Sequence, residues 1–480
     1  MGSSELLVAS CPLSCFYRSS IPTRHIFSMA MPFPSLSFFD SLQFTLGVNA
    51  ASLFNRAKSR YGDYFQFSVY GTPVFCITNP FAISTLEKQL AWNTAHKMPV
   101  TSNSTGPFLQ EVNPGFLLFT DLSHHKNRKS MINRYFSRVD NDSYIQQLIS
   151  DYHNILPSLR AMPSFDLGNA MFSRLMVNLL STHFYGIGLD RDEIARLDNY
   201  MKTALRIFRL SLAYPAPLFR SLVSPFLFGF HKERELVRAH LQSRLSAQPV
   251  CPLRSNYVSA FRENYMNPDQ PVSCSSSVLT DDALGLFLAG IDTVIASLDL
   301  ILKIVAIFPA VREKIRRESL EFFGDRQHCD PRQLKYARLV VLEVLRLYPV
   351  FPHLFKSVME ESVVDGYLLP AKSFVYIQLS SIHRDPRWFA DPLMFNPDRW
   401  TRYDFSSDST NTFLPFGLGA HHCPGADLAI LELSVLISLL LADFDVRDQN
   451  PLQEGDLCSI PLLFNGLSVR PRKRAFLTPL

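Results

Sequence analysis

Residues 416–425, with the sequence FGLGAHHCPG, constrain the fold of this chain more than any other segment. They place one cysteine, Cys423, between two glycines and immediately before an apolar run over residues 426–441. Because that run has helical spacing, a thiolate at Cys423 would lie where backbone N–H groups and the positive end of a helix favour negative charge. Gly419 and Gly425 would let the backbone approach a large, flat ligand closely.

The loop alone leaves three interpretations of Cys423. A cysteine sulfur held in this way is one of the few protein groups that can bind haem iron axially. A buried free cysteine is usually a small apolar side chain, and the run from His421 to Cys423 could also begin a zinc site. Zinc sites need a second ligand pair at short spacing, and none of the other seven cysteines forms a C-x2-C pair. The loop therefore favours haem.

Composition limits the size, the partners and the compartment. The chain has 480 residues, of which 47% are hydrophobic, with 39 Phe and 17 Tyr, so a large aromatic-rich core is possible. The net charge of +4 comes from scattered basic residues, which is not the balance of a nucleic-acid-binding protein. Eight irregularly spaced cysteines give no disulfide framework, which fits a reducing, cytosol-facing environment.

Two segments bear on membrane attachment. Residues 1–40 are poorly patterned and are expected to form a leader or membrane-proximal arm, without the ~18–20 apolar residues that span a bilayer. Residues 215–230 are apolar, interrupted by prolines and followed by basic residues. They are read either as a buried connector between two helices or as a loop that enters the membrane surface.

The remaining pattern is mostly helical. Alternating apolar residues about Gly71 predict a β-hairpin over 65–78, and a similar hairpin over 362–378 has a turn signal at Asp365-Gly366. If these distant hairpins share one sheet, the chain is one interlocked fold, mainly α with a small β-rich lobe (α+β). Helical spacing predicts helices over about 143–160, 170–185, 190–212, 230–246, 281–308, 310–323, 333–347 and 425–441.

Two of the predicted helices carry polar residues inside apolar runs. Glu343 and Arg346 are spaced i, i+3 on one helix face, and their apolar neighbours predict a buried pair with Arg399 as a third charge. An ordinary surface ion pair of little energetic value is the alternative. Residues 289–293, AGIDT, combine a mid-helix glycine that makes room for a ligand with an acid and a hydroxyl. The alternative there is a packing glycine beside a solvent-facing aspartate.

These motifs together resemble those of the cytochrome P450 family, the haem-thiolate monooxygenases. Four of them occur in the family's order over residues 40–470: HHKNR at 124–128, AGIDT at 289–293, Glu343-x-x-Arg346 with Arg399, and the cysteine loop. The resemblance implies a triangular-prism helical domain, formed by residues 41–480. It also implies haem b (iron protoporphyrin IX), held between the long central helix and the cysteine-loop helix.

The resemblance implies roles for single residues. Cys423 would be the axial ligand of the haem iron, with Phe416 packed near its sulfur and Gly425 in the turn that follows. The haem propionates would be bound by His421, His124, Arg128 and Lys356, the last of which stands where arginine is more usual. Asp292 and Thr293 would deliver protons for oxygen activation, and Glu343, Arg346 and Arg399 would form the supporting salt-bridge triad. Expected substrate-pocket residues are Phe287, Ala289, Gly290, Phe351, Leu354 and Phe464.

The implied activity is insertion of one oxygen atom from O2 into an apolar small molecule, such as a terpenoid, polyketide or lipid, in secondary metabolism. Electrons would come from NADPH through a separate NADPH-cytochrome reductase, at the cytosolic face of the endoplasmic reticulum membrane, and the type would be eukaryotic or fungal. A haem-thiolate isomerase or dehydratase acting on peroxides and a non-enzymatic haem-binding sensor are the alternatives. Asp292 and Thr293 argue against both, since neither alternative needs protons delivered to dioxygen.

Overall fold

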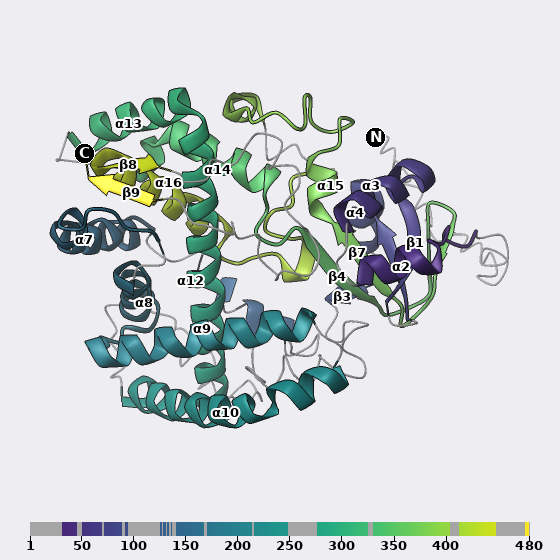
Figure 1. The fold of residues 1–480 in the computed structure, drawn as a ribbon, viewed down its shortest axis with the longest axis horizontal. Helices are drawn as coiled ribbons and strands as arrows, with labels where there is room; N and C mark the ends of the chain where they lie inside the picture. Colours follow the sequence, from purple (N-terminus) through teal and green to yellow (C-terminus); the bar gives the residue numbers. More distant parts are fainter. Residues whose placement is uncertain are drawn as a thin grey trace, which may run out of the picture.

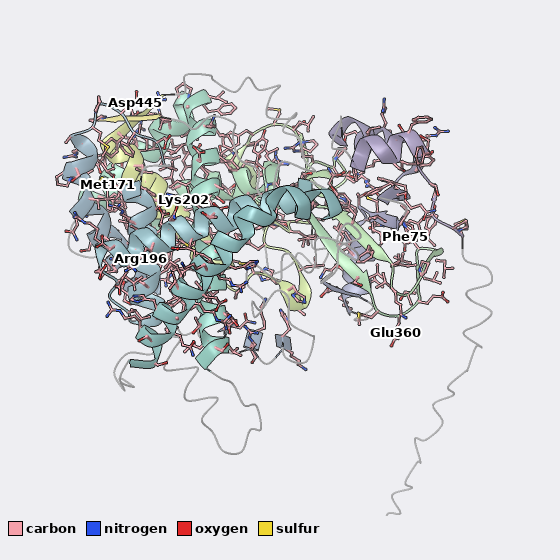
Figure 2. The ribbon with its side chains drawn as sticks, turned by 60° about the horizontal axis from the view of Figure 1, so that its bottom comes forward. Phe75, Met171, Arg196, Lys202, Glu360 and Asp445 are labelled. Carbon is pink, nitrogen blue, oxygen red and sulfur yellow. The ribbon has the colours of Figure 1, made fainter. Side chains whose placement is uncertain are left out.

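The computed structural model describes residues 31–45, 50–69, 72–88, 92–94, 125–126, 128–130, 132–133, 136, 141–167, 170–213, 216–247, 276–324, 330–403, 412–447 and 476–479. A large helical part and a smaller β-rich part lie side by side (Figure 1). Turned by 60°, the same arrangement places Met171 and Asp445 at the helical end and Phe75 and Glu360 at the β-rich end (Figure 2). This division confirms the predicted fold class.

The helical part is organised around α12, which runs through its middle (Figure 1). Helix α12 packs against α8, α10, α14 and α16, and its apolar sequence explains why a helix can be buried on so many sides. The other helices lie around it. Their bounds are α7 (Asn141–Arg160), α8 (Ala170–Tyr185), α9 (Arg191–Ala213), α10 (Ala216–Ala247), α12 (Ser276–Ile307), α13 (Pro309–Gly324), α14 (Lys335–Leu347) and α16 (Ala426–Asp443).

Among the described helices, α12 alone is long and apolar enough to cross a bilayer. Of its most apolar window, 67% is buried inside the protein, as expected for the central helix of a core. The length and composition of α12 therefore reflect its place in the fold, and they do not indicate a membrane span.

Helix α10 corrects one prediction. The pattern placed a helix at 230–246 and an irregular connector or membrane loop at 215–230, whereas the structure has one helix from Ala216 to Ala247. Pro217 falls in the first turn, where the missing N–H has no helical partner to lose. Pro225 lies in the interior, where a proline removes a hydrogen bond, and α10 as a whole packs on α9 and α12.

The β-rich part is built on a five-stranded sheet in the order β1-β2-β7-β4-β3. The hairpin of β1 (Tyr64–Val69) and β2 (Thr72–Ile77) is confirmed, and β2 pairs in parallel with β7 (Phe374–Gln378). Strand β4 (His353–Val358) is antiparallel to both β7 and β3 (Trp92–Thr94). Strands far apart in the sequence thus share one sheet, as predicted for an interlocked fold.

The second predicted hairpin is shorter than expected. Strands β5 (Ser362–Val364) and β6 (Tyr367–Leu369) form a separate two-stranded sheet, with left-handed Asp365 and Gly366 in the turn. The segment that follows leaves this hairpin as β7. Helices α2 (Phe38–Thr45), α3 (Ala50–Tyr61) and α4 (Pro80–Lys88) lie in the same lobe (Figure 1). Strands β8 (Phe444–Arg447) and β9 (Phe476–Pro479) pair at the far end of the helical part.

The cysteine loop joins the two parts of the molecule. Leu414 and Leu418 are buried in the hydrophobic cluster of the β-rich lobe. Leu428, on the first turns of α16, is buried in the large helical cluster. The loop is therefore anchored on both sides, which limits how far Cys423 can move.

Candidate functional site

The cysteine loop is closed by its own backbone. The N–H of Cys423 donates to the carbonyl of Phe416 at 2.9 Å, and the N–H of Gly417 donates to the carbonyl of Leu414 at 3.0 Å. Gly417 and Gly419 have φ values of +75° and +62°, a region that other residues rarely adopt. A short 3-10 turn, η4 (Gly419–His421), follows, and α16 begins three residues after Cys423. The predicted helix after the loop is confirmed, whereas the close approach of a flat ligand at Gly419 and Gly425 stays a prediction.

Opposing effects act on the thiol of Cys423. Burial raises its pKa, while a hydrogen bond from the N–H of Gly425 and the positive charge of Lys129 lower it. Lys129 is itself buried and donates to the carbonyl of His422. Burial lowers the pKa of Lys129, and the charge of Cys423 acts in the opposite direction. The net result is a raised pKa for Cys423, with Gly425 and Lys129 offsetting part of the cost of desolvating a thiolate.

Other cationic side chains gather around the loop. The rings of His421 and His125 have their centroids 3.8 Å apart. Lys356, on β4, is only 3% exposed and lies 3.3 Å from a carboxylate oxygen of Glu87. A second oxygen of Glu87 accepts the N–H of Ala420 at 3.2 Å. The site therefore combines one sulfur with basic side chains, including the ammonium groups of Lys129 and Lys356, a setting that suits an anionic ligand.

The structure separates the four residues predicted to bind propionates. His421 and Lys356 lie at the cysteine loop, and His124 falls outside the described residues. Arg128 instead directs its guanidinium to Asp282 of α12, in a buried pair with Nε to Oδ2 at 3.2 Å. Sequence reasoning missed His125, Lys129 and Glu87. His125 lies within the 124–128 motif and Lys129 directly follows it, which was a signal for these two, whereas Glu87 carried none.

Helix α12 presents different residues on different faces. Phe287 is fully buried against Tyr185 of α8, with ring centroids 5.2 Å apart, so it lies in the core and does not line a pocket. Gly290 is half-buried, and Cδ1 of Leu180 would be 3.4 Å from an added Cβ, an ordinary van der Waals contact with α8. The room for a ligand beside Gly290 stays a prediction.

Ala289 and Thr293 lie four residues apart and so share one face of α12. Ala289 is exposed, and the hydroxyl of Thr293 donates to the carbonyl of Ala289 at 2.6 Å. Asp292 is half-buried. Such a bond to the i−4 carbonyl competes with the regular helical hydrogen bond and loosens the helix locally.

The predicted lining residues outside α12 lie partly at the loop. Leu354 is half-buried, and its Cδ1 would be 4.0 Å from a Cβ on Gly417, so it borders the cysteine loop. Phe351 is 36% exposed. Phe464 lies outside the described residues.

The predicted charge triad forms a buried network. Arg346 donates to both carboxylate oxygens of Glu343 at 2.9 and 2.8 Å, and Nε of Arg399 donates to the same carboxylate at 3.0 Å. Glu343 and Arg346 are completely buried. A buried ion pair is tolerated only when its remaining polar atoms are also satisfied. The indole of Trp400 and the N–H of Asn396 complete that requirement, each donating to Glu343 at 2.9 Å.

These residues fit haem better than a single bound metal ion. In the part of the chain that the structure describes, no three His, Cys, Asp or Glu side chains are placed to hold a metal ion. Cys423 offers one sulfur with backbone and ammonium support for its negative charge. The basic side chains of His421 and Lys356 suit the two carboxylates that a haem carries, and Gly417 and Gly419 place no side chain of their own in the loop.

Comparisons with known proteins agree. The cytochrome P450 family model matches residues 30–474. The (+)-piperitol/(+)-sesamin synthase of Sesamum radiatum is 27% identical over 308 residues, 60% of this chain and 58% of that protein. Abscisic acid 8'-hydroxylase 1 of Oryza sativa subsp. japonica is 24% identical over 459 residues, 92% of this chain and 88% of that protein.

The curated relatives and the solved structure are matched over different fractions of their own lengths. For the first three curated relatives the aligned part spans 58%, 50% and 54% of their lengths. A solved structure of a retinoic acid bound cyanobacterial protein of this family has a TM-score of 0.72 at 22% identity, covering 94% of this chain and all of that one. Because the family model spans nearly the whole chain, this protein belongs to the cytochrome P450 family, whose fold binds haem b through a cysteine thiolate.

Proposed function

We propose that this protein is a haem-thiolate monooxygenase that inserts one oxygen atom from O2 into an apolar organic substrate. The observation that carries the proposal is the placement of Cys423. Its sulfur lies before the buried helix α16, accepts the N–H of Gly425 and belongs to a loop anchored in both hydrophobic clusters. Haem bound there would supply oxygen activation, promoted by the electron-rich thiolate.

Each residue of the site has a task in this proposal. Cys423 would bind the iron, and the N–H of Gly425 and the ammonium of Lys129 would offset part of the burial that raises the pKa of its thiol. His421 and Lys356 would bind the propionates, whereas the guanidinium of Arg128 is already paired with Asp282. Phe416 shields the sulfur and fixes the loop through its carbonyl. Glu343, Arg346 and Arg399 hold the segment that supports the loop.

Proton delivery is assigned to Thr293 and Asp292. The hydroxyl of Thr293 already forms a hydrogen bond to the carbonyl of Ala289, and rotation about χ1 would redirect that proton to the site. Asp292, half-buried beside it, would relay protons from solvent. An enzyme that rearranges peroxides, or a haem sensor, would have no use for such a pair.

The substrate is assigned to the apolar class. Ala289, Phe351 and Leu354 offer apolar surface, as small-molecule pockets generally do. Relatives are named for abscisic acid hydroxylation and for sesamin synthesis, which supports a terpenoid, polyketide or lipid-like substrate in secondary metabolism. Electrons would come from NADPH through a separate reductase.

Attachment to the cytosolic face of the endoplasmic reticulum membrane is also proposed. Phe38 and Phe39 of α2 are 75% and 74% exposed, at the end of the arm predicted over residues 1–40. Exposed neighbouring aromatic side chains of this kind partition into a lipid interface. The catalytic domain would then begin with α2, in line with the predicted boundary near residue 41.

Reduced holoprotein treated with carbon monoxide tests the ligand. Cys423→Ala is expected to abolish the difference band of thiolate-bound haem, and the buried Cys76→Ala variant is the matched control that keeps it. A normal band in Cys423→Ala would overturn the assignment.

Adding a reductase, NADPH and apolar substrates tests the activity. Oxygen consumption coupled to a hydroxylated product supports a monooxygenase. Rearrangement of a peroxide without NADPH would point to an isomerase instead.

A further inference from the structure

A carboxylate of this chain already lies beside Lys356, where a haem propionate is proposed to bind. Glu87, in the last turn of α4, accepts the N–H of Ala420 at 3.2 Å and faces the ammonium of Lys356 at 3.3 Å. It reaches the loop because Gly419 has no side chain: a Cβ there would overlap the Glu87 carboxylate. The contact joins three distant elements, α4, β4 and the cysteine loop.

The contact is buried, which gives it energetic weight. The side chain of Lys356 is 3% exposed and that of Glu87 is 15% exposed. A buried ammonium needs a negative partner, since the cost of desolvating it is large when it stands alone. Burial lowers the pKa of Lys356, and the charge of Glu87 opposes that effect. Glu87 therefore neutralises part of a group of cations that also includes Lys129.

Haem binding would bring two more carboxylates to this group. Lys356 has three N–H donors and can serve more than one acceptor, but two carboxylates on one ammonium repel each other. An Arg at this position would offer a wider fork of donors and relieve the conflict. With a lysine present, Glu87 and a propionate compete for the same charge.

We propose that Glu87 is a residue of the cofactor site, whose carboxylate competes with a haem propionate for Lys356 and thereby weakens haem retention. This inference rests on the haem binding proposed above. Replacing a residue with a purely structural role would weaken haem retention. Removing the charge of Glu87 is instead expected to strengthen haem retention.

Transfer of haem from the holoprotein to excess apomyoglobin, followed by absorbance, measures retention directly. Glu87→Gln keeps the shape and loses the charge, and it is expected to slow haem loss about three- to tenfold, the range of one ordinary hydrogen bond. Glu361→Gln makes the same charge change at an exposed position and is expected to match the wild type.

Variants of Lys356 test whether Glu87 acts on haem retention through Lys356. Lys356→Met is expected to speed haem loss, and adding Glu87→Gln to it should change nothing further, since the competition is gone. Lys356→Arg is expected to slow haem loss without any change at Glu87, which provides a test that does not depend on folding of the Glu87 variant.

Haem loss from Glu87→Gln at the wild-type rate or faster would overturn the inference. So would an equal slowing in the Lys356→Met background, because Glu87 would then not act through Lys356. If the wild type shows no thiolate-bound haem at all, the proposed function fails first, and the two failures are told apart by the carbon monoxide spectrum.

Discussion

The imidazole of His383 accepts a hydrogen bond from the backbone N–H of Leu414, with 2.8 Å between the two nitrogen atoms. Its other nitrogen, Nδ1, lies 3.0 Å from the carbonyl oxygen of Arg346 and must therefore carry the proton. Leu414 begins the cysteine loop, and Arg346 belongs to the buried charge network. One neutral histidine, at the end of α15 (Leu379–His383), thus connects that network to the loop that holds Cys423.

Because His383 is buried and neutral, it makes the free energy of unfolding depend on pH in the acid range. Burial lowers the pKa of His383 from 6.5 to about 3, so the unfolded chain binds a proton that the folded chain refuses in this interval. Stability is therefore full above pH 6.5 and falls as the pH drops towards 3, by up to ~1.4 kcal/mol per pH unit. Urea unfolding at pH 5 and pH 8 should show a smaller acid loss for His383→Gln than for wild type. Exposed His153→Gln is the control, and an unchanged slope in His383→Gln would contradict the assignment.

Arg346 cannot be replaced by lysine. Its guanidinium is fully buried and serves both oxygens of Glu343 as well as the carbonyls of His383, Pro392 and Met394. A lysine has three donors on one atom and leaves buried acceptors unpaired.

Arg346→Lys is therefore expected to lower the free energy of unfolding by about 3–5 kcal/mol, the cost of breaking a buried pair. Denaturant titration measures this loss. The exposed pair of Arg332 and Asp330 provides the control, since Arg332→Lys should change stability by less than ~1 kcal/mol.

The buried network shows what sequence patterns reveal and what they leave out. The i, i+3 spacing of Glu343 and Arg346 in an apolar run was sufficient to predict a buried pair, because local periodicity fixes which residues share a helix face. The partners from Trp400, Asn396 and His383 depend on how η3 (Pro397–Arg402), its preceding loop and α15 dock on α14, which periodicity does not contain. The contact of Glu87 with Ala420 likewise depends on how distant elements pack together, which periodicity does not contain.

The sequence also did not show which side of α12 faces each neighbouring helix. Phe287 and Gly290, before and within residues 289–293, were predicted to line the pocket, yet Phe287 contacts Tyr185 and Gly290 packs near Leu180, both of α8. An apolar run carries little information about which side meets a neighbour, because a helix buried all round has no polar face to orient it. The first half of α10 was not predicted as a helix for a related reason, because its sequence is apolar and contains prolines.

Glu432 is expected to act on stability in the direction opposite to His383. It is fully buried on α16, and burial raises its pKa from 4.5 to about 7, while a hydrogen bond from the hydroxyl of Tyr144 at 2.8 Å lowers it in part. The folded chain thus holds a proton that the unfolded chain releases, so stability is full below pH 4.5 and falls as the pH rises to 7.

Glu432→Gln keeps an acceptor for Tyr144 and removes the ionisation. It is expected to be more stable than wild type by about 1–3 kcal/mol at pH 8, with the difference vanishing below pH 4.5. Thermal or denaturant unfolding across this range measures the difference, with exposed Glu360→Gln as the control. A Glu432→Gln protein less stable than wild type at pH 8 would show that the carboxylate is ionised and paired.

Thr293 offers the sharpest test of the proposed chemistry, because its hydroxyl can be removed without disturbing the core. Thr293→Ala loses the hydrogen bond to the carbonyl of Ala289, which the regular helical bonding of α12 replaces. The variant should therefore fold and bind haem normally.

With a reductase and substrate, Thr293→Ala should consume NADPH but divert it to hydrogen peroxide, lowering product per NADPH by ~10-fold or more, since a positioned proton donor contributes at least that much. Thr293→Ser, which keeps a hydroxyl, should retain most of the coupling. Measuring product, peroxide and NADPH together separates this outcome from a general loss of activity, in which all three fall in proportion. Full coupling in Thr293→Ala would remove Thr293 from the proton path and leave Asp292 as the residue to test.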